Sequence, residues 1–306
     1  MSRILRRRKN GKKDLGYAAA IFGGICWGFS GCCGQFLFQE KGATAEWLVA
    51  LRLIGAGILL MAAGFIRSGK GNLKIFHSRR DRIHLVVFAL AGILMAQYPY
   101  YAAIQYSNAG TATVLQYMFP VFILLIVCAQ ERRMPSPVEG LAIALCLAGT
   151  FILGTHGNFR ELTLTPKALF FGLLAAFGGV LYNMIPGDLM KRYGVCQVLG
   201  FGMFLAGIVM TAAVRPWRYE MAWDAGLILA LAGVTVIGTA VAFGLYLGGV
   251  SIIGPFKGSL YASTEPVSAV IISFLWLGTS FTGMDLLGFG LILGTVLLLT
   301  VYQSKL

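Results

Sequence analysis

The stretch AQYPYYAAIQY, residues 96–106, places amide and phenol side chains between two long apolar runs. At about 100° per residue, a helix gathers its polar members on one arc, which holds Gln97, Tyr98, Tyr101 and Gln105. Such side chains are costly toward lipid but can hydrogen-bond a polar solute. We therefore expect Gln97, Tyr98 and Tyr101 to line a cavity. The alternative for a tyrosine is the aromatic belt at the membrane interface, which we expect for Tyr106.

A second polar face contains Glu265, the one carboxylate deep within an apolar segment. The face also holds Lys257, Tyr261, Thr264 and Ser268. An ionisable group inside the membrane marks a functional site by default. The hypothesis is that Glu265 exchanges protons, with Lys257 two turns away as its charge partner. The structural alternative is a carboxylate that caps the backbone interrupted by Pro266.

Other apolar segments add candidates for the wall of a substrate cavity. These are Trp27, Ser30, Gln116, Tyr117, Tyr182, Asn183 and Tyr246. Trp27 can stack on a flat or cationic ligand or simply fill space. Gly24 and Gly28 have the spacing of close helix packing. For Arg52, two turns into its segment, we expect the side chain to reach the outer surface rather than to bind an anion.

The sequence contains none of the common motifs of soluble enzymes. The six cysteines lie in or beside apolar segments, where cysteine packs as a small hydrophobe, so we expect neither a disulfide framework nor a metal site. No HExxH, Walker A, dinucleotide-binding or GxSxG pattern occurs. We expect no enzyme activity and no cofactor.

Composition requires a membrane protein with several spans. The chain is 58% hydrophobic and 12% charged, whereas soluble domains are about 25% charged. The basic N-terminus resembles the start of a signal peptide, but we expect a retained first helix because no cleavage site stands out. Runs of spanning length predict ten helices, at 16–38, 45–66, 83–106, 109–130, 136–154, 167–186, 195–214, 223–249, 254–277 and 283–303.

The distribution of charge fixes the predicted orientation. With the N-terminus inside, the inner segments hold 18 Lys and Arg and the outer loops hold 5. Cytoplasmic loops carry such an excess, so both termini are predicted to be cytoplasmic in the plasma membrane. This bias accounts for most of the net charge of +13, and we expect the lipid bilayer, not nucleic acid, as the partner. The pattern carries no signal for the oligomeric state.

Weak internal similarities divide the chain in two. CLAGTFIL (146–153) resembles LILGTVLL (291–298), and Pro120 and Pro266 lie 146 residues apart, each within a long apolar run. Five spans per repeat would insert the second half upside down, as in many secondary transporters with midplane substrate sites.

Several motifs resemble the drug/metabolite transporter superfamily, EamA type, over about residues 16–303. They are Trp27-Gly28-x-Ser30, Ala50-Leu51-Arg52 with Gly55, Pro120 with Glu131 and Gly140, and Glu265-Pro266 with Gly288. The second half departs from the pattern, with Thr279 where a closing Glu is expected. The resemblance implies transport of small metabolites, amino acids among them, or of drugs.

The predicted fold is all-α and integral to the membrane, with ten transmembrane helices in two inverted repeats around a central cavity. The parts are a basic N-terminus (1–15), a first five-helix repeat (16–154), an outer linker (155–166), a second five-helix repeat (167–303) and the C-terminus (304–306). We expect a secondary transporter of an amino-acid-like or amphipathic cationic metabolite, working by alternating access. The alternatives are an exporter of drugs or quaternary amines and, less favoured, a channel or a scaffold.

The proton-exchange hypothesis predicts a specific defect. Glu265→Gln keeps the shape of the side chain but removes its titratable group. Uptake into proteoliposomes driven by a pH gradient should be lost, while exchange without a gradient serves as the control for folding. Full pH-driven uptake by the variant would contradict the hypothesis.

Overall fold

The computed structural model describes residues 2–158 and 162–303, and all its regular elements there are helical. The first five spans are α1 (Ser2–Glu40), α2 (Ala45–Ser68), α3 with η2 and α4 (Arg79–Val87, Phe88–Leu94, Met95–Tyr106), α5 with α6 (Ala109–Gln116, Phe119–Gln130) and α7 (Pro137–Thr155). The last five are α8 (Pro166–Met184), α10 (Val195–Val214), α11 with η4 and α12 (Ala225–Ala232, Gly233–Val241, Ala242–Ile253), α13 with α14 (Pro255–Ala262, Thr264–Leu277) and α15 (Gly283–Gln303).

Short helices occupy some of the connections, namely η1 (Gly69–Phe76), α9 (Gly187–Tyr193) and η3 (Pro216–Arg218). Within the described ranges, nine helices are long and apolar enough to cross a membrane, and Thr264–Leu277 is a shorter apolar helix. This helix belongs to the ninth span, which is interrupted before Thr264. The predicted ten-helix membrane fold is confirmed. The predicted C-terminus 304–306 and residues 159–161 of the predicted linker lie outside the described residues.

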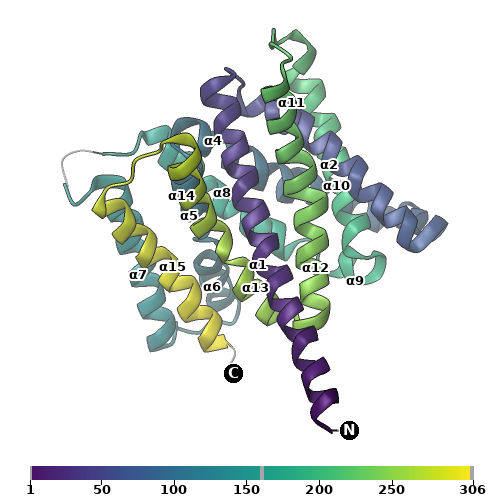
Figure 1. Ribbon diagram of the computed structural model, residues 1–306, viewed down its shortest axis with the longest axis horizontal. Helices are drawn as coiled ribbons and strands as arrows, with labels where there is room; N and C mark the ends of the chain where they lie inside the picture. Colours follow the sequence, from purple (N-terminus) through teal and green to yellow (C-terminus); the bar gives the residue numbers. More distant parts are fainter. Residues whose placement is uncertain (1, 159–161, 304–306) are drawn as a thin grey trace.

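The packing of the spans relates the two halves of the chain. α2 packs against α10, and α7 packs against α15. α1 packs against α12 and α14, while α8 packs against α4 and α6. Exchanging the first five spans for the last five maps α2–α10 and α7–α15 onto themselves and the contacts of α1 onto those of α8, as expected of two repeats. The start of α1 and the end of α15 lie on the same side of the bundle (Figure 1). The repeat boundaries themselves stay a prediction.

Irregular helix geometry recurs at matching positions. The π-helical segments η2 and η4 begin at Phe88 and Gly233, which are 145 residues apart. The fourth span is interrupted after Gln116 and the ninth at Ser263. Pro120 and Pro266 then stand in the first turns of α6 and α14, where the N–H that proline lacks has no partner within its own helix.

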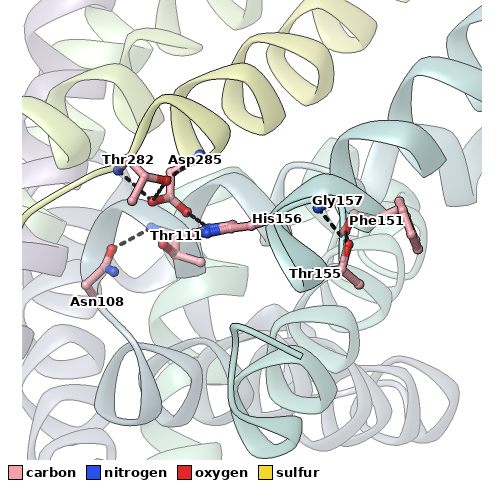
Figure 2. A network of polar contacts seen from close by, with 8 residues as sticks. All are labelled: Asn108, Thr111, Phe151, Thr155, His156, Gly157, Thr282 and Asp285. Atoms are coloured by element: carbon pink, nitrogen blue, oxygen red, sulfur yellow. Dashed lines mark hydrogen bonds and ion pairs between the residues drawn. The ribbon is translucent and has the colours of Figure 1, made fainter. Parts of the chain in front are cut away.

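On the side of the bundle away from the chain ends, side-chain caps and one ion pair hold the ends of the spans (Figure 2). Asn108 Oδ1 accepts a hydrogen bond from the backbone N of Thr111 at 2.8 Å, which caps α5. His156 Nε2 lies 2.8 Å from Asp285 Oδ1, so the end of α7 is tied to the start of α15. Asp285 Oδ2 in turn accepts from the backbone N of Thr282 at 2.8 Å. These contacts fix the pair of helices at the side of the bundle.

A glycine allows α4 and α8 to pack closely. Pro99 has no N–H, so the carbonyl oxygen of Met95 lacks its usual helical donor. A Cβ on Gly178 would lie 2.0 Å from that oxygen and 2.6 Å from the backbone N of Ala96. Because backbone atoms cannot rotate away as a flexible side chain can, this position of α8 requires glycine.

We expect Gly178→Ala to destabilise the protein. The added methyl group should cost about 1–3 kcal/mol, the usual range for overpacking, and lower the melting temperature of the detergent-purified protein by several degrees. Gly244→Ala on α12 is the matched control, because a Cβ there meets nothing within 4 Å. Equal melting temperatures for the two variants would contradict the packing argument.

Candidate functional site

A cavity of about 500 Å³ lies inside the bundle and receives side chains from nine spans. Its volume is in the range of small-molecule sites. The interruptions of the fourth and ninth spans both reach it, as broken helices do in many transporters. The lining residues are Trp27, Ser30, Arg52, Ala96, Gln97, Tyr100, Tyr101, Gln116, Tyr117, Phe119, Pro120, Ile123, Gly179, Tyr182, Asn183, Met203, Phe243, Tyr246, Ala262, Ser263, Glu265, Val296 and Thr300.

The structure brings ten of the fourteen sequence-predicted site residues into this lining. They are Trp27, Ser30, Gln97, Tyr101, Gln116, Tyr117, Tyr182, Asn183, Tyr246 and Glu265. Residues that are widely separated in the sequence therefore meet at one cavity.

Arg52 lies at one wall of the cavity. Its Nη1 donates a hydrogen bond to Gln97 Oε1, and its guanidinium carbon lies 5.0 Å from the centre of the Tyr101 ring. The residue is 8% exposed, so the expectation that it reaches the outer surface is wrong. The amide and the ring face of α4 offer the guanidinium a polar environment that lipid does not.

Two tyrosines extend this wall toward α1. Tyr101 is 1% exposed, and its hydroxyl lies 3.5 Å from Ser30 Oγ. The Tyr100 hydroxyl lies 3.0 Å from Thr113 Oγ1 on α5. A Cβ on Gly31 would meet the Tyr100 hydroxyl at 2.6 Å, and one on Gly34 would meet the Tyr101 ring at 2.6 Å. The small residues of α1 therefore make room for the polar side of α4.

Glu265 stands at the interruption of the ninth span, in the first turn of α14. Tyr117, the residue at which α5 ends, donates from its hydroxyl to Glu265 Oε2 at 2.9 Å. The same hydroxyl lies 3.4 Å from the carbonyl oxygen of Ala262, which Pro266 leaves without a helical donor. The positive end of the α14 dipole also favours a negative charge here. The two interrupted spans thus meet through one hydroxyl and one carboxylate.

Aromatic rings complete the wall opposite α4. The Trp27 ring packs edge-on against Phe243 at 5.2 Å and tilted against Tyr246 at 5.3 Å between ring centres. Gly28 contacts α14. A Cβ added to Gly28 would lie 2.7 Å from the carbonyl oxygen of Glu265. The glycines of α1 therefore serve packing, as their spacing predicts.

Four predicted residues lie outside the lining. Tyr98 donates to Glu46 Oε1 at 2.9 Å, between α4 and α2. Thr264 Oγ1 donates to the carbonyl oxygen of Ile21 at 3.1 Å. Tyr261 packs on Tyr17 at 4.9 Å between ring centres, and the exposed Lys257 places its Nζ 3.4 Å from the Tyr17 hydroxyl. The prediction assumed one continuous helix through residues 257–268, whereas the interruption at Ser263 separates Lys257 and Tyr261 from the face of Glu265.

Sequence reasoning missed other members of the lining. Tyr100 falls outside the polar arc of its segment, and the apolar Phe119 and Phe243 carried no signal. Arg52 did carry one, because a cation within a span is itself evidence of a functional site.

The side chains described in the structure offer no cluster of three or more His, Cys, Asp and Glu that could hold a metal ion. The six cysteines are free thiols. What the cavity presents is hydrogen-bonding groups, aromatic faces and two ionisable side chains of opposite charge.

Comparison with known proteins finds transporters that are similar to this chain. The uncharacterized inner membrane transporter YicL of Salmonella typhimurium is 35% identical over 295 residues, which cover 96% of this chain and 98% of that protein. The uncharacterized transporter YetK of Bacillus subtilis is 24% identical, over 83% of this chain and 77% of its own length. A crystal structure at 15% identity covers 97% of this chain and 98% of its own, with a TM-score of 0.59, and so has the same fold.

The EamA-like transporter family model matches the chain twice, over residues 14–155 and 166–301. Together the two matches cover nearly all of the transmembrane bundle. The chain therefore belongs to the EamA-like transporter family.

Proposed function

We propose that this membrane transporter moves a small organic metabolite across the cytoplasmic membrane by alternating access of the central cavity. The observation that carries the proposal is the cavity at the two interrupted spans, enclosed by helices from both halves of the chain. Such a site can face either side of the membrane if the halves rock against each other.

Contacts on the outer side of the cavity support closure there. Gln35 is 1% exposed and joins three elements. Its Nε2 donates to Thr279 Oγ1 at 2.9 Å, and its Oε1 accepts from the backbone N of Ala109 at 2.8 Å. Trp276 stacks on Phe29 and Phe36 nearby, at 5.7 and 5.5 Å between ring centres. These contacts join α1 to the start of α5 and to the end of the ninth span.

The opposite side of the cavity extends toward the face that carries the chain ends. Its lining includes Asn183 near the end of α8 and Thr300 near the end of α15. The excess of Lys and Arg in the loops on this face supports a cytoplasmic orientation. We therefore assign the arrangement to a state open to the cytoplasm.

Energy for transport would come from a solute or ion gradient. Glu265 is the proposed proton-exchange group, because its carboxylate lines the cavity and accepts a hydrogen bond from Tyr117. A channel would need a continuous path, which the Gln35 contacts oppose. A scaffold would have no use for polar groups in the membrane interior, where they are costly.

Counterflow tests the proposed function. Proteoliposomes preloaded with an unlabelled metabolite mixture should accumulate labelled substrate, and the rate should saturate with concentration. Empty liposomes are the control for leak. Flux that rises linearly without saturation would indicate a channel, and no flux with any compound would contradict transport.

Gln35→Leu should loosen the outer closure. The change keeps the size of the side chain but leaves the buried N–H of Ala109 without its acceptor, at a cost of about 1–3 kcal/mol. Hydrogen–deuterium exchange of a peptide spanning residues 107–112 should accelerate. Thr279→Val, which removes the contact with Thr279 alone, is the matched control and should leave that peptide unchanged. Unaltered exchange in Gln35→Leu would contradict this role of Gln35 in holding the start of α5.

A further inference from the structure

We propose that a groove at the start of α3 binds an anionic phospholipid of the cytoplasmic leaflet, with Arg79 and Arg82 receiving its phosphate. The groove is separate from the central cavity, because the two share no lining residue. The inference goes beyond transport, since it gives the protein a specific binding site for a component of the membrane around it.

The groove has a volume of about 400 Å³ and is lined by Arg79, Arg82, Ile83, Val86 and Val87, all of α3. α3 begins after two spans have crossed the membrane, so its first turn lies on the side of the bundle that carries the N-terminus. The excess of Lys and Arg on this side supports a position at the cytoplasmic surface.

Both guanidinium groups of the groove are available to an anion. Arg79 and Arg82 are exposed, and neither takes part in an ion pair among the residues that the structure describes. Residues three apart on a helix are neighbours, with Cβ atoms about 5–6 Å apart. Each guanidinium has five N–H donors in a planar fork. The two forks can therefore bind the oxygens of one phosphate group together.

Asp81, the carboxylate between the two arginines in the sequence, does not neutralise them. Its side chain is 3% exposed and is directed to α9. Its Oδ2 accepts hydrogen bonds from Arg192 Nη1 at 2.9 Å and from the Tyr193 hydroxyl at 2.7 Å. The positive charge of the groove is therefore left for a ligand to compensate.

The apolar part of the groove favours a lipid over a soluble anion. Ile83, Val86 and Val87 are 55%, 42% and 45% exposed, and they follow the arginines along α3 toward the interior of the membrane. A phospholipid has the same order, with its phosphate at the surface and its acyl chains directed inward. A free phosphate ion would contact the arginines and leave the three apolar side chains unused.

The charge of the groove favours an anionic lipid over a zwitterionic one. Phosphatidylcholine carries a quaternary ammonium beside its phosphate, so it brings no net charge to the two arginines. Phosphatidylglycerol has the same phosphate without the cation. Each basic side chain near an anionic membrane surface strengthens binding by about fivefold, and the positive end of the α3 dipole acts in the same direction.

Native mass spectrometry of the full chain in detergent gives the first test. The probes are phosphatidylglycerol, phosphatidylcholine with the same acyl chains, and glycerol 1-phosphate, which has no acyl chains. We expect the first phosphatidylglycerol to bind about 25-fold more tightly than phosphatidylcholine, and glycerol 1-phosphate to bind more weakly than phosphatidylglycerol. Equal binding of the two lipids would overturn the proposal. Glycerol 1-phosphate binding as tightly as phosphatidylglycerol would identify a site for soluble anions and would overturn it too.

A double variant then assigns the site. Arg79→Gln with Arg82→Gln should weaken phosphatidylglycerol about 25-fold, or fivefold for each side chain. Binding of phosphatidylcholine to the same preparation should be unchanged, which controls for folding. Lys13→Gln with Arg132→Gln is the matched control, because it removes two exposed positive charges outside the groove. This control should bind phosphatidylglycerol as the unmodified protein does.

Two results for the variants would overturn the site. Unchanged affinity for phosphatidylglycerol in the Arg79 and Arg82 variant would place the lipid elsewhere. An equal loss of affinity in both double variants would show that the lipid responds to the net charge of the protein and not to the groove.

Discussion

The structure depends on how a membrane-embedded backbone satisfies its hydrogen bonds. In lipid every backbone N–H and C=O needs a partner, so a helix can be interrupted only where protein or water supplies one. The chain has its interruptions near Tyr117 and at Ser263, both at the cavity. At the second, Pro266 frees the carbonyl oxygen of Ala262, and the Tyr117 hydroxyl lies 3.4 Å from it. The interrupted helices therefore need the polar side chains of the cavity as hydrogen-bond partners. The glycines of α1 allow the helices to pack closely enough for these contacts to form.

The same constraint explains why the polar contacts of the cavity join different elements. Arg52 on α2 contacts α4, Tyr117 at the end of α5 contacts α14, and Gln35 on α1 contacts the start of α5. Of these contacts, the one between Tyr117 and Glu265 joins the two halves of the chain, so it would have to change if the halves rock.

The sequence predicts the fold well because its signals are local. Apolar length and the count of loop charges are enough for ten spans, and helical periodicity is enough to place Gln97 and Tyr101 on a polar face. The positions of the misassigned side chains depend on contacts between helices that are distant in the sequence. The partner of Arg52 is a neighbouring helix, and no local pattern shows which helix that is. Tyr98 shares the polar arc of Tyr101 but faces Glu46. Lys257 and Tyr261 lie outside the cavity lining because the helix is broken at Ser263, a feature that a continuous helical wheel cannot represent.

The position of Arg52 also bears on how the chain is made. α2 is synthesised before α4, so when it enters the bilayer the guanidinium has neither Gln97 nor the Tyr101 ring beside it. An arginine at the centre of a membrane helix costs about 2.5–3.5 kcal/mol at insertion, but from two turns inside the N-terminal end of α2 its long side chain can reach the interface. It can turn inward once the third span arrives. Biogenesis and activity would then use two orientations of one side chain, and the wall of the cavity would be completed only when the nascent third span docks on the second.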